Sequence, residues 1–150
     1  MKSRYRGTRA EVRALDAWIK LNRAVESVGG LLRQTIEAAG LTVGQFAVLE
    51  ALTYVGPLAP SELARRVLRS QANVTTVLDN LEREGLIERN KSSQDRRVVT
   101  VEVTASGRRQ IERIMPAHVE RITWAFRALG AREQETLAAL CKKLGLSNSK

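Results

Sequence analysis

The stretch that decides the fold runs from residue 60 to residue 107 and reads PSELARRVLRSQANVTTVLDNLEREGLIERNKSSQDRRVVTVEVTASG. Apolar residues recur at three- and four-residue steps over 61–69 and again over 70–84, which predicts two consecutive helices with Ser61 and Ser70 as their N-caps. After Gly85 the apolar residues alternate over Leu86–Arg89 and Val98–Val103, and the polar turn KSSQDRR separates these two runs. A β-hairpin is therefore expected. The order of short helix, tight break, second helix and hairpin indicates a winged helix-turn-helix.

Helical patterns flank this stretch on both sides. A long apolar stripe predicts a helix from Arg9 to Ala39, with Gly40 as its C-cap. Thr42 and Gln45 form a capping-box pattern at the start of the next helix, which ends by 56–57. Thr104 begins a helix that runs past Pro116 with a kink, and a final amphipathic helix is expected over Ala131–Leu144. The fold class is mostly α with a small β-hairpin wing.

The expected organisation is one compact domain with three parts. Residues 1–40 form an N-terminal dimerisation helix, residues 41–104 a winged helix-turn-helix DNA-binding region, and residues 105–150 C-terminal dimerisation helices. The first and fifth predicted helices carry long apolar stripes, and the winged helix-turn-helix is too small to cover them. An exposed apolar patch of that size favours a homodimer, in which a second copy covers it.

Composition narrows the class of protein. The chain of 150 residues has 25 Lys and Arg against 16 Asp and Glu, a formal net charge of +9, which favours a polyanionic partner. One cysteine, Cys141, cannot form an internal disulfide or supply a zinc site alone. We find neither a bilayer-spanning apolar run nor a signal peptide, so a cytoplasmic protein is expected. Motifs of phosphate-binding loops, hydrolases and metalloproteases are missing, so neither an enzyme nor a cofactor or metal is expected.

The second predicted helix of the 60–107 stretch has the properties of a DNA-reading helix. When its apolar residues face the protein, small and amide-bearing side chains remain on the outer face, and these suit the edges of bases in the major groove. Arg65, Arg66 and Arg69 on the preceding helix would lie near phosphates. Arg96 and Arg97 at the hairpin tip suit the negative potential of a narrow minor groove, with Asp95 orienting an arginine. The simpler alternatives are a solvated helix face and an ordinary charged turn.

At this point the sequence resembles a known family. Residues 73–89, NVTTVLDNLEREGLIER, and residues 95–107, DRRVVTVEVTASG, resemble the recognition helix and wing of the MarR family of transcriptional regulators. Val103 stands where the family usually has Leu. MPAHVERI at 115–122 and RALGAREQETLAALCKKL at 127–144 resemble the late helices of the family, so the likeness extends over nearly the whole chain.

The resemblance implies a homodimer in which the first and last helices intertwine. It also implies binding to palindromic double-stranded DNA, repression of nearby genes, and release by a small, often phenolic, ligand. By position it assigns Ser70, Gln71, Asn73, Thr75 and Thr76 to the major groove and Arg97, with Asp95 and Arg96, to the minor groove. The complete predicted DNA-binding set is Ser61, Arg65, Arg69, Ser70, Gln71, Asn73, Thr75, Thr76, Asp95, Arg96 and Arg97.

Four further residues invite a functional interpretation. Trp18 and Tyr54, with the loop GPLAP at 56–60, are candidates for a ligand pocket, although core or dimer packing is the favoured explanation for Trp18, which lies on an apolar stripe. Cys141 and His118 are expected to have structural roles. Two other functions stay open at this stage: a winged helix used for protein–protein assembly, and a DNA-binding protein with little sequence preference. The arginines at the hairpin tip argue against the first, and the polar, lysine-free helix face argues against the second.

Overall fold

The computed structural model describes residues 5–67, 71–91 and 99–148, with only the backbone of residues 71 and 72. The chain divides into two compact units. One unit is the continuous segment Leu32–His118, which we call the winged unit. The other, which we call the terminal unit, combines the segment up to Leu31 with the segment from Val119 onwards.

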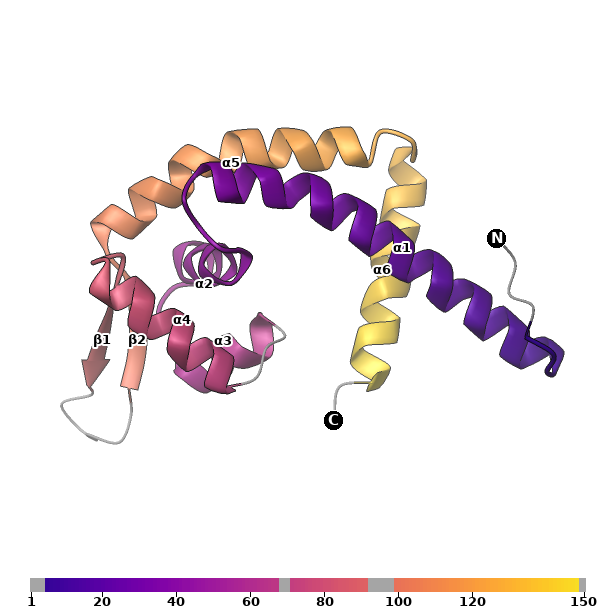
Figure 1. Cartoon of the computed structure of the whole chain (residues 1–150), viewed down its shortest axis with the longest axis horizontal. Helices are drawn as coiled ribbons and strands as arrows, with labels where there is room; N and C mark the ends of the chain where they lie inside the picture. Colours follow the sequence, from indigo (N-terminus) through magenta and orange to yellow (C-terminus); the bar gives the residue numbers. More distant parts are fainter. Residues whose placement is uncertain (1–4, 68–70, 92–98, 149–150) are drawn as a thin grey trace. The chain divides into compact units, whose positions relative to one another are not determined.

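The described residues form six helices and one two-stranded antiparallel sheet, drawn in Figure 1. The C-terminal end of helix α1 (Arg9–Ala38) belongs to the winged unit. Helix α5 (Ala105–Ala125) begins in the winged unit and ends in the terminal unit. Between them, in chain order, lie α2 (Val43–Tyr54), α3 (Pro60–Arg66), α4 (Gln71–Arg83), β1 (Ile87–Lys91) and β2 (Val99–Val103). Helix α6 (Ala131–Asn148) belongs to the terminal unit and extends four residues beyond the predicted end at Leu144.

Two glycines end helices in the left-handed conformation, as their sequence positions predict. Gly40 has φ 78° and Gly85 has φ 69°. In each case the amide of the following residue reaches five residues back, from Leu41 to the Ile36 carbonyl at 3.2 Å and from Leu86 to the Leu81 carbonyl at 2.9 Å. This is the Schellman arrangement, which satisfies carbonyls that the helix leaves unpaired. It turns the chain sharply after α1 and after α4.

The capping box predicted for α2 is confirmed. The Gln45 amide donates to Thr42 Oγ1 at 3.1 Å, and the Thr42 amide donates to Gln45 Oε1 at 2.9 Å. The start predicted for α3 is wrong: Ala59, not Ser61, is the N-cap, and Pro60 is the first helical residue. Proline suits that position because its φ is already helical and an amide there would lack a partner. Ser61 lies exposed in the first turn.

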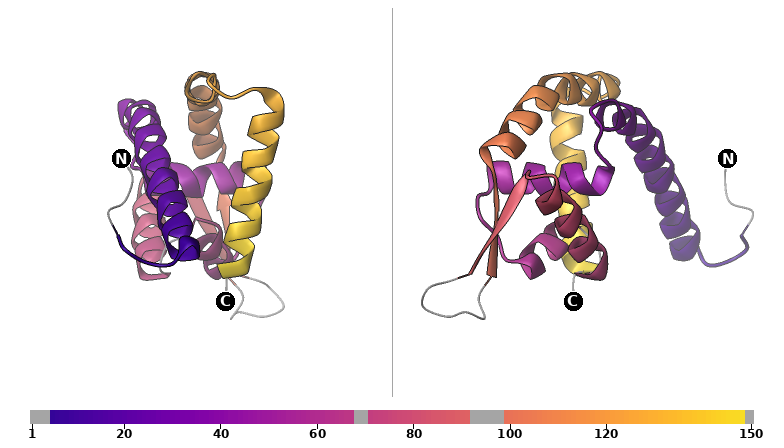
Figure 2. Two further views of the ribbon diagram at one scale, coloured as in Figure 1. Left: turned by 90° about the vertical axis from the view of Figure 1, so that its right-hand side faces the viewer. Right: turned by 60° about the vertical axis from the view of Figure 1, so that its left-hand side comes forward.

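The hairpin pairs Ile87 with Val103 and Lys91 with Val99 at its two ends. A third segment joins it, because Leu58 and Val101 exchange two backbone hydrogen bonds of 3.1 and 2.8 Å. Leu58 lies in the loop before α3, so this loop is fixed to the edge of the sheet. The views in Figures 1 and 2 show β1 and β2 extending from α5 towards the side of the winged unit where α3 lies.

One core holds the winged unit together. Its most deeply buried side chains come from α2, α3, α4, β2 and α5, namely Val48, Leu49, Leu52, Leu63, Val74, Leu78, Leu81, Val101 and Ile111. Helix α4 contacts α2, α3 and β1, so it is supported from three sides. His118 is also buried, with its ring centroid 4.6 Å from that of Phe46. Burial lowers the pKa of His118 below its ordinary value, although the charge of Glu50 opposes this effect.

The start of α5 is joined tightly to the end of α4. The Thr104 side chain accepts from the Gly107 amide at 3.1 Å and donates to the Gly85 carbonyl at 2.8 Å. The Thr104 amide donates to the Leu86 carbonyl at 3.0 Å. A Cβ on Gly107 would lie 2.2 Å from that same carbonyl oxygen, so glycine is required here. The TASG segment therefore fixes the exit of the hairpin against the end of α4.

The terminal unit consists of the N-terminal part of α1, the C-terminal part of α5, and α6. Helix α6 has no buried residue, and apolar side chains stay exposed on all three segments: Trp18, Val25, Val119, Trp124, Leu137, Leu140, Leu144 and Leu146. A groove of about 680 Å³ runs between α1 and α6, lined in part by Trp18, Val25, Cys141 and Leu144. Among the described helices no single one is long and apolar enough to cross a membrane; only α1 and α2 together, as a bent pair, pass by length and composition.

Candidate DNA-binding site

Helix α4 presents two different faces. Val74, Leu78 and Leu81 are buried with at most 1% of their surface exposed. On the other side Asn73, Thr75 and Thr76 are exposed, as the sequence predicts. Amide and hydroxyl side chains that project from a helix well supported behind suit the base edges of a major groove. The backbone of Gln71 begins the helix, which places this residue at the end that enters the groove in helix-turn-helix proteins.

Helix α3 lies against α4 and supplies positive charge beside it. Leu63 and Ala64 bury its inner face, while Arg65 and Arg66 are exposed in its last turn. The Ala59 amide donates to Glu62 Oε2 at 3.2 Å, so the one acidic residue of the helix is used at its N-terminus. The exposed part of α3 therefore carries two arginines, on a helix that packs against α4.

Arg89 on β1 joins the hairpin to α4 by two ion pairs. Its Nη2 lies 2.6 Å from Asp79 Oδ1, and its Nη1 pairs with Glu82 Oε2. Burial opposes the charge of Arg89, but the hydrogen bonds and negative charges of Asp79 and Glu82 outweigh it and raise its pKa. This three-residue cluster, which we call the Arg89 clamp, fixes the direction in which the hairpin leaves the recognition helix.

The structure places part of the predicted set and leaves part outside the described residues. Ser61 and Arg65 are exposed on α3, and Asn73, Thr75 and Thr76 are exposed on α4, which packs against α3. For Gln71 only the backbone is described. Five predicted residues lie outside the described residues: Arg69, Ser70, Asp95, Arg96 and Arg97.

The two predicted ligand-pocket residues lie in different units. Trp18 belongs to the terminal unit and Tyr54 to the winged unit, and both side chains are more than half exposed. Trp18 lines the groove between α1 and α6. The third part of the predicted pocket is the loop at 56–60. This loop contains Leu58, which is buried and pairs with β2. The proposed pairing of Trp18 and Tyr54 stays a prediction.

Sequence reasoning missed two features of the site: the Arg89 clamp and the Leu58 bridge. A signal for the clamp is present, because Asp79 and Glu82 are three residues apart on one helical face and Arg89 follows in the predicted strand. The sequence carries little signal for the Leu58 bridge. A strand is recognised by alternating apolar and polar residues, and a single paired residue cannot show that alternation.

The structural elements around α4 define a class of protein. A short helix, a recognition helix with a polar outer face and a two-stranded wing make this chain a winged helix-turn-helix, the architecture of DNA-binding transcriptional regulators. Comparison with known proteins agrees: the MarR family model matches residues 41–99. The uncharacterized HTH-type transcriptional regulator YkoM of Bacillus subtilis is 35% identical over 89% of this chain and 87% of its own.

Two further proteins extend the likeness over most of the chain. MhqR of Bacillus subtilis, also an HTH-type transcriptional regulator, is 30% identical over 90% of this chain and 93% of its own. The solved structure of BpsR from Bordetella bronchiseptica has a TM-score of 0.78 and 28% identity, covering 87% of this chain and 98% of that one. The chain belongs to the MarR family of transcriptional regulators.

Proposed function

We propose that this regulator reads a palindromic DNA operator as a homodimer, with α4 in the major groove and the hairpin at the minor groove. The observation that carries the proposal is the outer face of α4, where Asn73, Thr75 and Thr76 are exposed above a tightly buried apolar face. Phosphate contacts come from Arg65 with Arg69, and the base contacts include Gln71 at the start of α4 and Ser70, which precedes it in the sequence. Ser61 lies on the same side as Arg65 in the exposed part of α3.

The test is selection of bound duplexes from a random pool followed by sequencing. A two-fold symmetric dimer places its recognition helices in successive major grooves, so half-sites should recur about 10 bp apart. Enrichment of a palindrome with this spacing supports the proposal. Enrichment of no sequence at all, with tight binding to the whole pool, would indicate a protein that binds DNA without reading it.

The dimer is supported by the terminal unit. Helix α6 buries no residue within the single chain, although Leu137, Leu140 and Leu144 lie along it. Monomeric proteins rarely expose a contiguous apolar patch of this kind, and a second copy of the same surface would cover it. Sedimentation at low micromolar concentration should give the mass of a dimer, and Leu140→Glu with Leu144→Glu should give a monomer. A monomeric wild-type mass would contradict this arrangement.

We further propose that a small aromatic ligand releases the protein from DNA, so that it acts as a repressor. The structurally similar BpsR supports this proposal, because 6-hydroxynicotinic acid regulates the DNA binding of that protein. A regulator of this kind needs no catalytic group or cofactor, and it works in the cytoplasm, where it meets DNA. A panel of hydroxylated aromatic acids added to the protein–operator complex should include at least one that lowers affinity.

A further inference from the structure

His118 is a buried titratable residue that the DNA-binding site does not use. It is the only histidine of the chain, and it is the last residue of the winged unit on α5. Only 6% of its surface is exposed, and its ring centroid lies 4.6 Å from that of Phe46 on α2. Packing against Phe46 explains why the ring is buried, but not why a titratable ring occupies this position.

The surroundings of His118 suit a neutral ring and not a charged one. Its Nδ1 is buried and forms no hydrogen bond within the described residues. A charged imidazole ring donates from both of its nitrogens, so protonation leaves a charged N–H group buried without an acceptor. Burial accordingly lowers the pKa of His118, and the negative charge of Glu50 opposes this effect.

The charged groups around His118 lie on three elements. On α2, the half-buried Glu50 is the group that favours a proton on the ring. The end of α1 carries Arg33 and Glu37, and both are exposed to solvent, which screens their charges. On α5 itself Arg121 follows one helical turn later, and a like charge at that spacing disfavours a proton. The balance between burial and Glu50 therefore determines whether the ring is charged.

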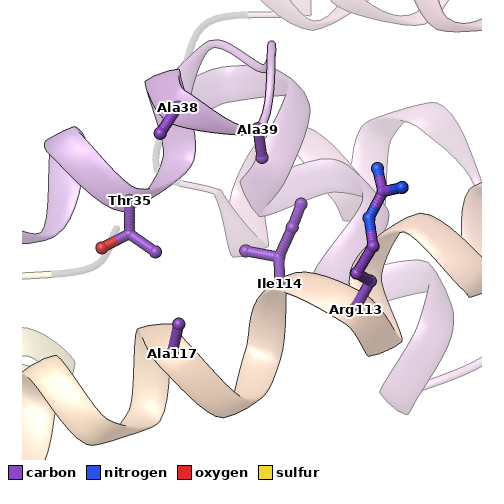
Figure 3. A pocket seen from close by; sticks show the side chains of 6 residues that line it. All are labelled: Thr35, Ala38, Ala39, Arg113, Ile114 and Ala117. Carbon is purple, nitrogen blue, oxygen red and sulfur yellow. The ribbon is translucent and has the colours of Figure 1, made fainter.

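The part of α5 that carries His118 has room to move. Figure 3 shows a hollow of about 300 Å³ between the end of α1 and this part of α5, lined by Thr35, Ala38, Ala39, Arg113, Ile114 and Ala117. Pro116 lies two residues before His118 and has no amide to donate to the Glu112 carbonyl, so α5 lacks one hydrogen bond here. Open space and a missing hydrogen bond both lower the free energy needed to shift this turn.

Phe46 links His118 to the recognition helix. Its side chain is buried in the same core as Leu78 and Leu81 of α4. Helix α2 contacts α4 directly, so it forms part of the support behind the exposed face of α4. When the His118 ring leaves, Phe46 loses its contact, and a closely packed core fills such a gap only by shifting its side chains. A change at His118 therefore reaches the support of α4.

We propose that His118 is an acid-sensitive switch, whose protonation drives its ring away from Phe46, loosens α2 behind α4 and weakens binding to operator DNA. The proposal rests on the operator recognition proposed above and adds its regulation by pH. At neutral pH the ring is uncharged and stays packed. As the pH falls, a proton binds the displaced, hydrated ring more strongly than the buried one, so the displaced arrangement becomes more populated.

Fluorescence anisotropy with the selected operator, from about pH 7.5 to about pH 5 at constant ionic strength, tests the switch in the range where histidine titrates. Wild-type protein without a histidine tag should lose at least about tenfold in affinity, since each proton that the bound state excludes lowers affinity by up to about tenfold per pH unit. Protonation of other groups makes the protein more positive and strengthens DNA binding, so a loss in acid has the opposite sign from general electrostatics. His118→Phe should bind equally tightly at both ends of the range, because its ring packs on Phe46 and cannot be protonated.

Glu50→Gln and its matched control Glu37→Gln test the charge that acts on the ring. Glu50→Gln removes the group that favours the proton, so the loss of affinity should begin at lower pH. Glu37→Gln changes an exposed residue of α1 and should leave the onset unchanged. The single histidine signal in NMR spectra reports the titration of His118 in the wild-type protein. The loss of affinity should follow that titration, which tests the switch even where a variant fails to fold.

The outcomes separate the switch from the proposed function. Operator binding that is unchanged or tighter in acid, or a loss that persists in His118→Phe, overturns the switch and leaves DNA recognition intact. A loss of affinity that coincides with loss of helical circular dichroism, or with dissociation into monomers, also overturns it, because acid then unfolds the chain or separates the dimer. Failure of the wild-type protein to bind any selected duplex at neutral pH, with normal titration of His118, would instead overturn the proposed function.

Discussion

Replacing Arg89 with Met should loosen the hairpin from the recognition helix and lower stability by a calculable amount. The change removes two ion pairs in which Arg89 is 26% exposed, Asp79 52% and Glu82 41%. Partly exposed pairs contribute about 0.2–1 kcal/mol each. The two carboxylates left three residues apart on α4 then repel each other by a further ~0.2–0.5 kcal/mol. We therefore expect the free energy of unfolding to fall by about 0.6–2.5 kcal/mol.

Urea unfolding at a fixed protein concentration measures this loss, because the concentration of a dimer affects its apparent stability. The matched control is Arg83→Met, which removes an exposed arginine from the same helix. The same substitution of Arg89 is then made in a background carrying Asp79→Asn and Glu82→Gln, which closes a double-mutant cycle. If Arg89→Met lowers stability equally in both backgrounds, the ion pairs are not the cause. The clamp would then have to be understood as packing of the arginine stem.

Three further predictions concern other parts of the molecule. Gly107→Ala should destabilise the protein by more than about 1 kcal/mol in urea unfolding, because its Cβ would lie 2.2 Å from the Leu86 carbonyl oxygen; an unchanged midpoint would contradict the close contact. The lowered pKa of His118 means that the unfolded chain binds this proton more readily, so stability should decrease as pH falls below the ordinary value of 6.5. His118→Phe should flatten that dependence, and an identical pH profile would refute it. Arg97→Ala should reduce the slope of log affinity against log salt by about one unit per arginine, hence about two per dimer, and an unchanged slope would exclude the minor-groove contact.

Sequence patterns predict much of the winged unit because its signals are local. Gly40 and Gly85 stop their helices through a left-handed conformation that glycine adopts easily, and both have positive φ in the structure. Alternation of apolar residues over 98–103 reflects the faces of a strand, and β2 occupies Val99–Val103. The exposed positions of Asn73, Thr75 and Thr76 follow from the helical period alone.

Features that depend on contacts distant in the chain could not be predicted in the same way. Leu58 pairs with Val101, 43 residues away, through backbone hydrogen bonds that no side-chain pattern records. The start of α3 differs from its prediction because serine is the commoner N-cap, whereas Pro60 and Glu62 act together with Ala59 here. The hollow beside Arg113 exists only because α1 and α5 lie side by side there. Such features require the folded chain.

The identity of α4 as the reading element is tested most directly by Asn73→Ala on two duplexes. Affinity is measured by fluorescence anisotropy for the selected operator and for a random duplex of equal length, at one salt concentration. Loss of base-edge hydrogen bonds should cost about 1–3 kcal/mol on the operator, roughly a five- to 150-fold loss of affinity. The random duplex should be almost unaffected, because a neutral side chain releases no counterions. An equal loss on both duplexes would show that α4 does not read the sequence.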